Sequence, residues 1–524
     1  MATYDILEEP WIEAVSLGGD PVRLGLLGVL EQAPKLFALA DTSPLVRCGI
    51  YRLLIAFVMD AFRLEGLTEV EDLFKGGLFD RETLVRYVEG VGRSRFDLFD
   101  AEHPFLQSGP TEGIDDPAPG PVARLFQNLP SGTFATHFFH AREDGHAFSP
   151  AVCVRGLAAV APFMTAGGAG FSPSVNGMPP WYVLVRGRSL FETIVLNCAP
   201  LELWEEEEPT PPAWRRDESV VPKQERACTS PLEAFTWQPR RIRLSPGEGG
   251  VCTYSGEPSP VLVREAVFAH GFKSTGGWFD PHVAYLYRDE GTSPLRPRED
   301  RQLWRDTGPL LLLRQKDFQG TGAKVRYQRP YVVQQREALG RAGILDRDSP
   351  LSVDTYGLRT DGKMKVFEWR TETLSLPAEV FYDPRAPAQL QEAVEVAQRV
   401  EYHVKRAAKM LYPREGGGNS SAFERLITRI QQAYWDVLRG EFTNRLLPRL
   451  AAQGPNDLSA PESLRASWAD AVRATAHASF DRHADSLDAD GAALRRLVEA
   501  RRYLAMKTTP RKPAATEEIP KKEE

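Results

Sequence analysis

The stretch Met164–Asn197 carries the strongest indication of how this chain folds. It reads MTAGGAGFSPSVNGMPP over residues 164–180 and WYVLVRGRSLFETIVLN over residues 181–197. The apolar run Tyr182–Val185 predicts a short strand, and the run Leu190–Leu196 predicts a helix after a tight turn. A glycine-dense loop that leads directly into these packed elements is therefore anchored at a defined place in a mixed α and β domain.

The glycines of this stretch, Gly167, Gly168 and Gly170, lack a Cβ, so another backbone can approach the chain closely here. The loop matches neither of the usual phosphate-binding glycine patterns. The chain has no GxxxxGK[ST] at this point, and the loop lacks the strand–GxGxxG–helix order of a dinucleotide site. An anchored glycine loop without a nucleotide motif predicts contact with something large and backbone-like.

Length, charge and cysteine content limit the class of protein. A chain of 524 residues favours at least two domains. The formal net charge of −7 argues against unselective coating of nucleic acid, but it is compatible with a local basic groove on an acidic body. Five cysteines, few and odd in number, indicate reduced intracellular thiols.

No targeting or membrane segment is expected. The first ten residues are acidic and lack the apolar core of a signal peptide. The most apolar helix candidate, Val46–Phe62, carries Arg47, Arg52 and Asp60, which favours a core helix over a membrane span. We therefore expect a cytoplasmic protein with no membrane partner.

The chain changes character near Pro387. Residues 1–380 mix short strands, helices and long loops rich in proline and glycine, which predicts an irregular α/β domain with loops that bind something. Further candidates there are a helix at Pro44–Phe62 and strands at Val261–Val263 and Tyr331–Val333. Residues 507–524 are rich in Lys, Glu, Pro and Thr, which favours disorder.

Residues 387–506 are helical by periodicity. Four apolar stripes recur at helical spacing: Leu390, Val394, Ala397, Val404, Ala408 and Leu411; Phe423, Ile427, Ile430, Tyr434 and Val437; Leu464, Trp468, Val472 and Phe480; and Leu494, Leu497, Val498 and Leu504. Short polar and glycine-rich breaks separate them. Four amphipathic helices with short connections predict an antiparallel four-helix bundle, so the fold class is α+β.

Metal-binding patterns are weak. His137, His140 and His146 are candidate ligands for a metal-dependent hydrolase, but they lack the glutamate and spacing of HExxH, and loop histidines are the simpler interpretation. Cys252-Thr-Tyr-Ser255 resembles half of a zinc knuckle, and the chain contains no CxxC. We expect neither a metal nor another cofactor.

Catalytic patterns are also missing. The chain has no GxSxG or SxxK motif and no cysteine in a recognisable catalytic setting. His103 and His282 each lie within two residues of a carboxylate, but such close neighbours rarely form a general-base pair, which favours turn histidines. The sequence therefore weighs against an enzyme.

Basic residues cluster with glycines and aromatic residues, which suits phosphate contact. The alternative is a solvated face with ion pairs, because Asp and Glu are interleaved, and the residues alone leave both interpretations open. The clustered residues are Arg240, Arg241 and Arg243; Arg296, Arg298, Arg301 and Arg305; Arg314, Lys316, Lys324, Arg326 and Arg329; and Arg359, Lys363 and Lys365.

Segments spaced through residues 1–370 resemble, in the same order, the CasA-type (Cse family) large subunit of the type I-E CRISPR surveillance complex, Cascade. They are ILEEPWI (6–12), FDLFDAEHPFLQ (96–107), the glycine loop with its strand and helix, and WFDPHVAY (278–285) followed by YGLRTDGKMKVFEW (356–369). The helical bundle after them corresponds to the second domain of that family.

The resemblance implies a non-enzymatic subunit for antiviral defence. Members recognise the protospacer-adjacent motif in double-stranded DNA through the minor groove, promote strand separation and R-loop formation, and recruit a helicase-nuclease. Guide RNA pairing supplies the long-sequence specificity, as in another CRISPR effector. The implied partners are target DNA, the 5′ end of the guide RNA, the backbone, guide-end and small subunits of Cascade, and the helicase-nuclease.

The resemblance also implies site residues. The glycine loop corresponds to Gly167, Gly168, Ala169 and Gly170, a lysine finger to Arg288, and a wedge hairpin to Asp361-Gly362-Lys363-Met364. No glutamine stands at the wedge tip, so Lys363 or Met364 would insert beside the first base pair. A loop at 133–148 would dock other subunits and the guide RNA through Phe134, His137, Phe138 and Phe139.

Overall fold

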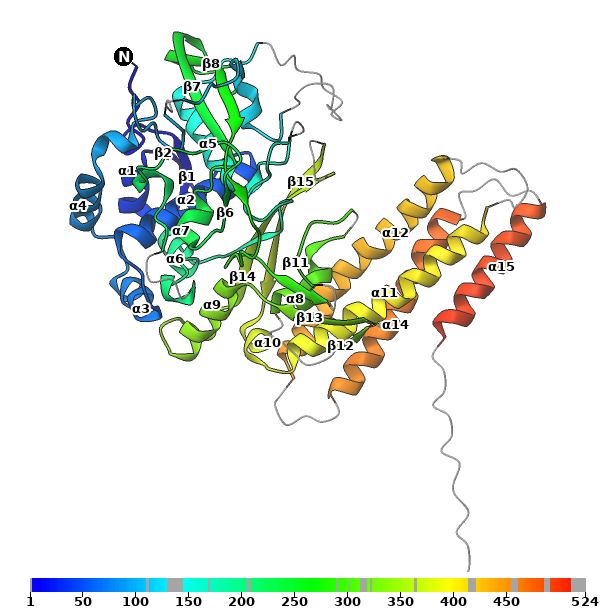
Figure 1. Ribbon diagram of the computed structural model, residues 1–524. Helices are drawn as coiled ribbons and strands as arrows, with labels where there is room; N and C mark the ends of the chain where they lie inside the picture. Colours follow the sequence, from blue (N-terminus) through cyan, green and yellow to red (C-terminus); the bar gives the residue numbers. More distant parts are fainter. Residues whose placement is uncertain are drawn as a thin grey trace, which may run out of the picture. The chain divides into compact units, whose positions relative to one another are not determined.

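The structure is a computed structural model that describes residues 2–109, 113–129, 145–167, 170–204, 209–288, 291–299, 301–311, 318–320, 323–361, 365–412, 421–453, 460–484 and 491–509. The chain divides into two compact units, Met1–Leu376 and Pro377–Glu524 (Figure 1). Each unit is described by itself.

The first unit combines helices with several small sheets. Its α-helices are α1 (Leu26–Gln32), α2 (Pro44–Ala61), α3 (Leu67–Gly76), α4 (Arg81–Val91), α5 (Pro150–Phe163), α6 (Leu190–Leu196), α7 (Pro231–Phe235), α8 (Thr307–Leu311) and α9 (Tyr331–Arg341). The predicted helix Leu190–Leu196 is therefore confirmed at both ends, and Pro44–Phe62 to within one residue.

The strands pair mostly in antiparallel fashion. The sheet orders are β2–β1–β3 (Pro21–Leu24, Ile12–Ser16, Leu36–Leu39), β15–β14–β5 (Val366–Leu376, Leu351–Thr360, Tyr182–Val185), β4–β8–β7 (Gly120–Pro121, Pro258–His270, Arg240–Val251), β11–β10–β13–β12 (Gly291–Pro294, Tyr285–Arg288, Ala323–Gln328, Phe318–Gly320) and the parallel pair β6–β9 (Glu225–Arg226, Lys273–Ser274). The predicted strands at Tyr182–Val185 and Val261–Val263 are confirmed, the second as part of β8.

The predicted strand at Tyr331–Val333 is wrong, because these residues begin helix α9. Pro330 occupies the N-cap position, and the residues after Val333 are strong helix formers (Gln-Gln-Arg-Glu-Ala-Leu). Val332 and Val333 are both buried, so tertiary packing satisfies their apolar side chains within a helix.

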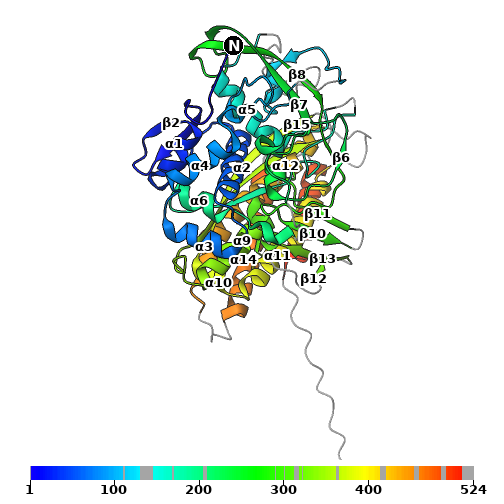
Figure 2. The same cartoon turned by 60° about the vertical axis from the view of Figure 1, so that its left-hand side comes forward.

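Helix α2 lies in the core of the first unit, near α5 and α6 (Figure 2), and packs against α5, α6 and α7. A Cβ on Gly49 would lie only 2.4 Å from the carbonyl oxygen of Ala158 in α5, so the two helices touch backbone to backbone. Its residues from Leu45 to Asp60 are buried almost without interruption, which confirms the predicted core helix. Among the described residues, no helix is long and apolar enough to cross a membrane.

The centre of α2 holds a buried ion pair that is distant in sequence. Only 1% of the Arg52 side chain is exposed, and its two terminal nitrogens donate to the two Asp280 carboxylate oxygens at 3.0 and 2.8 Å. The carboxylate also accepts hydrogen bonds from Asn176 Nδ2 and from the His282 backbone N–H, each at 3.0 Å. The two charges therefore satisfy each other through paired hydrogen bonds, which offsets part of their desolvation, although Arg52 Nε has no partner among the described residues.

His282 is a turn residue, as predicted, but its ring is fully buried. Arg52 Nη1 donates to its Nδ1 at 3.1 Å, so the imidazole must carry its proton on Nε2, which then donates to the Asn197 carbonyl at 2.9 Å. The ring stacks on Phe235, with ring centroids 4.9 Å apart. Burial and the adjacent Arg52 charge lower the pKa of His282 to about 4, whereas Arg52 holds the pKa of Asp280 at about 2 despite its burial.

The second unit is a helical bundle built from α11 (Ala386–Met410), α12 (Ser421–Glu441), α14 (Ala460–Ala484) and α15 (Gly491–Thr508), with the short helices α10 (Ala378–Tyr382) and α13 (Leu447–Ala451). Tyr434 donates to Ala397 O at 2.8 Å, and His403 bonds Tyr503 at 2.9 Å while Arg496 bonds Leu411 O at 3.2 Å. Gln431 Nε2 also donates to Glu401 Oε1 at 3.0 Å, one turn further along α11 and one turn back along α12, so α12 and α15 both run antiparallel to α11. The predicted α+β fold class with a C-terminal antiparallel bundle is confirmed.

The apolar stripes on the bundle helices were mostly predicted correctly. The described members of the first three stripes are buried, except Val437, which is 43% exposed. The fourth stripe is half wrong, because Leu494 and Val498 are 52% and 56% exposed. Helix α15 buries Leu497, Ala500 and Leu504, which lie three and four residues apart on one face. Leu494 and Val498 lie at the side of this buried face.

Removing one partner of the buried pair should be strongly destabilising. We expect Arg52→Met to lower the free energy of unfolding by about 3–5 kcal/mol, because Asp280 is left as an uncompensated buried charge. Combining it with Asp280→Asn should cost clearly less than the sum of the two single changes. Denaturant unfolding of the four proteins tests this, and additive effects would show that the two groups do not interact.

The stability of the first unit should fall as the pH is lowered from 6.5 to 4. In the unfolded chain His282 takes up a proton near pH 6.5, whereas in the folded chain it does so only near pH 4. The unfolded state therefore binds one more proton in this window. Across the whole window this lowers the free energy of unfolding by about 3 kcal/mol. Asp280 contributes separately, because its stabilising effect is lost only below its ordinary pKa, toward pH 2.

His282→Gln isolates this effect. The variant keeps a polar side chain but takes up no proton, so its unfolding free energy should decline less steeply between pH 6.5 and 4 than that of the parent. Denaturant titrations at several pH values measure the difference in slope. An identical slope in both proteins would rule out His282 as the titrating group.

Candidate nucleic-acid interface

The two described ends of the glycine loop have backbone conformations that favour glycine. Gly167 and Gly170 have φ angles of +60° and +78°, in the left-handed region where a Cβ is strained. A Cβ on Gly167 would also lie 3.0 Å from Arg240 Nη2. The loop enters from Met164 at the end of α5 and leads through Pro173 and Asn176 into β5.

Arg240, the first residue of β7, supports the loop from behind. Its side chain donates to the Thr165 carbonyl at 2.6 Å and to the Ser172 carbonyl at 2.5 Å, on the two sides of the glycines. The residue is only 6% exposed, and its guanidinium carbon lies 4.4 Å from the ring centroid of Phe171. Burial lowers the pKa of Arg240 to about 10, so the group remains charged at neutral pH. One buried cation therefore fixes both ends of the loop.

Asn176 links the loop segment to the ion pair in the core. Its Nδ2 donates to Asp280 at 3.0 Å and contacts Tyr182 Oη at 3.2 Å, at the start of β5. Tyr182 Oη in turn donates to the Pro162 carbonyl of α5 at 3.0 Å. The segment after the glycines is thus tied to the same buried network as α2.

A hollow of about 530 Å³ brings the loop next to a second sequence-predicted element. It is lined on one side by Gly170–Gly177 and on another by Tyr285, Thr292 and Pro294 of the β10–β11 hairpin. The remaining wall is the turn from Lys273 to Phe279, in which Gly276 and Gly277 both have left-handed φ angles, +83° and +80°. Main chain without side chains therefore borders the hollow from two directions.

Arg288 is the last residue of β10 and pairs with Gly291 of β11 across the hairpin end. Its backbone thus belongs to the hairpin that borders the hollow with Gly170. Of its side chain nothing is described.

The β14–β15 hairpin carries the predicted wedge. Its pairing with β5 ends at Tyr356, opposite Tyr182, so the ribbon from Gly357 onward extends beyond the sheet as two strands. Asp361 and Lys365 close its tip, since Asp361 N–H donates to Lys365 O at 3.1 Å and Lys365 N–H to Asp361 Oδ1 at 3.0 Å. The tip residues Gly362, Lys363 and Met364 lie outside the described residues.

Several further predicted site residues also lie outside the described residues. These are Gly168 and Ala169 in the loop, and Phe134, His137, Phe138, Phe139 and His140 in the docking segment. His146 is described, and its Nδ1 lies 3.5 Å from Thr253 Oγ1. In the described part of the chain, no three His, Cys, Asp or Glu side chains gather as a metal site would require.

Most of the described basic clusters are ion-paired within the protein. Arg241 and Arg243 both contact Asp116, at 2.9 and 3.0 Å, so these two prominent cations of the sequence do not form a free basic surface. The same holds for Arg301 with Asp306, Arg329 with Glu337, and Arg359 with Glu299 and Glu368. The ion pairs of the alternative interpretation are therefore present at these positions.

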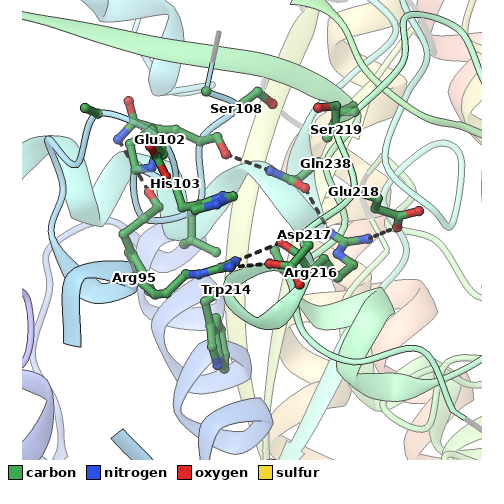
Figure 3. Close-up of a pocket in the computed structure, with 18 residues that line it drawn as sticks. Arg95, Glu102, His103, Ser108, Trp214, Arg216, Asp217, Glu218, Ser219 and Gln238 are labelled. Atoms are coloured by element: carbon green, nitrogen blue, oxygen red, sulfur yellow. Dashed lines mark hydrogen bonds and ion pairs between the residues drawn. The ribbon is translucent and has the colours of Figure 1, made fainter. Parts of the chain in front are cut away.

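A second hollow, of about 350 Å³, is lined by the segments 101–109 and 213–220, with His103 among its residues (Figure 3). Its guanidinium groups already have protein partners. Arg95 contacts Asp217 and donates to the Arg216 carbonyl at 3.0 Å, and Arg216 donates to Gln238 at 2.9 Å. Internal pairing of this kind stabilises the fold and leaves less charge for a ligand.

Sequence reasoning missed the supporting residues of the loop. Arg240 was grouped with a surface cluster, and neither Asn176 nor the Gly276-Gly277 pair was singled out. The adjacent glycines were a usable signal, because two left-handed residues in succession indicate a special turn. The burial of Arg240 had no local signal, since its two acceptors lie 68 and 75 residues away in the chain.

The described chain thus combines an α/β unit that holds the glycine loop with a helical bundle. The family model of CRISPR-associated protein Cse1 matches residues 5–479. The chain belongs to this family, which confirms the predicted Cse1-type large subunit.

Solved structures support the fold. Cse1 from Acidimicrobium ferrooxidans is 22% identical, with 97% of this chain and 99% of that chain covered and a TM-score of 0.74. Thermus thermophilus CasA (Cse1) is also 22% identical, with 97% and 100% covered and a TM-score of 0.72. A chain of a CRISPR RNA-guided surveillance complex is 18% identical, with 96% and 100% covered and a TM-score of 0.73. No curated protein sequence matches the chain.

Loss of Arg240 should loosen the glycine loop. We expect Arg240→Ala to lower the free energy of unfolding by about 1–3 kcal/mol, because the Thr165 and Ser172 carbonyls lose their donor. Amide hydrogen exchange around Phe171 should become faster. Arg243→Ala is the matched control on the same strand, since Arg243 is 37% exposed and touches only Asp116 among the described carboxylates. Equal effects of the two changes would contradict the bracing role.

Proposed function

We propose that this chain is the large subunit of a CRISPR RNA-guided DNA surveillance complex and recognises the protospacer-adjacent motif in double-stranded DNA. The observation that carries the proposal is the glycine loop. Its described ends, Gly167 and Gly170, are left-handed glycines held by buried Arg240, and Gly170 borders the same hollow as the β10–β11 hairpin. Family membership supports the class of complex.

The geometry suits the minor groove. Glycine at three of its four positions lets main-chain N–H and C=O groups come close to base edges that longer side chains would keep at a distance, and Ala169 adds only a methyl group. The minor groove distinguishes A·T from T·A pairs poorly, because both present similar acceptors. We therefore propose relaxed readout, with more than one motif accepted, through Gly167, Gly168, Ala169 and Gly170 together with Arg288.

The wedge would act after the motif is bound. The β14–β15 ribbon extends past its sheet, which suits a tip that enters a duplex. Long or apolar side chains unstack base steps when they insert, so Lys363 and Met364 are the residues proposed to start strand separation and R-loop formation.

The remaining proposals concern partners. The segment with Phe134, His137, Phe138 and Phe139 is proposed to dock the guide RNA 5′ end and neighbouring subunits. The chain is further proposed to recruit the helicase-nuclease, to have no catalytic activity of its own and to act in the cytoplasm against invading DNA. The alternative, a metal-dependent hydrolase using His137, His140 and His146, predicts a stoichiometric bound transition metal, which metal analysis of the purified chain measures.

A bulky residue in the loop should impair DNA binding. We expect Gly170→Leu to weaken binding of motif-bearing duplex by the assembled complex at least about tenfold, since a side chain there keeps the main chain from the groove. Gly19→Leu is the control, because Gly19 has a similar left-handed φ, +93°, in a turn between β1 and β2 with open space around it.

Both variants carry the same kind of backbone strain, so their unfolding temperatures should fall alike. The proposal then requires that only Gly170→Leu loses affinity in a titration with labelled duplex. Binding of the Gly170→Leu complex at the strength of the Gly19→Leu complex would refute the role of the loop.

Changes at the wedge should affect strand opening more than initial binding. The double variant Lys363→Gly/Met364→Gly lacks the side chains proposed to insert beside the first base pair. The open region of the DNA duplex should therefore form more slowly. Permanganate footprinting over time measures bubble size and rate, and duplex binding without guide complementarity serves as the control. A bubble of unchanged rate and size would exclude these residues from strand separation.

A further inference from the structure

Lys223 lies against the glycine loop in an unusual backbone conformation. Its ammonium nitrogen is 3.9 Å from the position that a Cβ on Gly170 would occupy. Its φ angle is +61°, which costs a non-glycine residue about 1 kcal/mol or more. Such strain persists only where the surroundings enforce it, and it is concentrated at functional sites.

The backbone around Lys223 is held by a neighbouring segment. The Lys223 N–H donates to the Gly271 carbonyl at 3.0 Å, and the Lys273 N–H donates to the Gln224 carbonyl at 2.8 Å. The turn is closed by Gln224 N–H, which donates to Val221 O at 3.2 Å. The backbone of Lys223 is therefore fixed to the segment 271–273, although its side chain is exposed.

Two further basic residues, Arg240 and His270, belong to the same site. Arg240 lies opposite His270 in the β7–β8 register, and the rings of His270 and Phe171 are stacked with centroids 4.3 Å apart. Burial and then the positive charges of Lys223 and Arg240 lower the pKa of His270, which disfavours a further positive charge on this ring. Within the described residues, Lys223 has no carboxylate at ion-pair distance, unlike most of the arginines in the predicted clusters.

Lys273 shows what a paired cation in the same place looks like. It lines the hollow beside Gly170, is 55% exposed, and bonds Glu225 at 2.6 Å. Lys223, in contrast, keeps its positive charge uncompensated by a described acid on a strained and fixed turn. An ammonium group with no acid beside it among the described residues, next to a glycine-rich loop, suits a phosphate of a chain that lies along that loop.

We infer that Lys223 binds a backbone phosphate of the DNA strand that passes over the glycine loop. The inference rests on the proposed motif recognition and adds a contact to it, a single charge that positions the duplex without reading its bases. A phosphate contact of this kind contributes to affinity and to its salt dependence, but it leaves the preference among motifs unchanged.

The test uses the assembled complex with its guide RNA and a motif-bearing duplex. Lys223→Gly removes the charge and also relieves the left-handed strain, so the unfolding temperature should stay equal or rise. The affinity should nevertheless fall by about fivefold at low salt, and the slope of log affinity against log salt should become shallower by about one. The ratio of affinities for two different motifs should not change.

Two control variants and one reference variant make the result specific. Lys223→Arg keeps the charge and should retain the parental salt slope. Lys75→Ala removes a cation of α3 that is 52% exposed and paired with Glu71 and Asp72, so it should leave the slope unchanged. An unchanged slope in Lys223→Gly, or an equal loss of affinity in Lys75→Ala, would overturn the inference. Gly170→Leu separates the two proposals. Normal DNA binding by this variant would refute motif recognition by the loop. If Gly170→Leu loses DNA binding while Lys223→Gly keeps its affinity and salt slope, only the Lys223 contact is refuted.

Discussion

The buried pair of Arg52 and Asp280 is the constraint on which the first unit depends. It joins the middle of α2 to a turn 228 residues later in the chain. The same carboxylate accepts from Asn176, behind the glycine loop, and from the His282 backbone. A pair of charges removed from water is costly unless every lone pair and proton is satisfied. Core helix, loop segment and the start of the β10 region are therefore held in one arrangement.

The glycine loop illustrates how main chain can be presented to a partner. Arg240 satisfies a carbonyl on each side of the glycines, so polar support lies on the buried side and no side chain is needed on the other. The cations near the loop are also divided between the buried and the exposed side. Arginines that are buried or ion-paired organise the fold, and Lys223 beside Gly170 keeps an exposed charge. A chain with a net charge of −7 can thus present local positive charge where DNA is proposed to lie.

Much of the fold followed from local patterns. The strand Tyr182–Val185 and the helix Leu190–Leu196 have the ends that their apolar runs predicted. Periodicity also identified the bundle helices, but it predicted the wrong buried face for part of α15. Which of its apolar residues are buried depends on how α15 packs against the neighbouring helix α11. At Tyr331 the β-branched residues predicted a strand, but the chain forms helix α9 there, because Pro330 stands at its N-cap and helix-forming residues follow. The wedge and docking residues stay predictions from the family resemblance.

The sequence by itself determined the family, the α+β class, the four amphipathic helices and the place of the glycines, since periodicity, glycine spacing and family motifs are local properties of the chain. Only the tertiary structure decided which cations are free. Arg241 and Arg243 are neutralised by Asp116, more than 120 residues away, and Arg240 is turned into the protein by two distant carbonyls. Charge pairing and burial depend on contacts across the fold, and no local pattern encodes them.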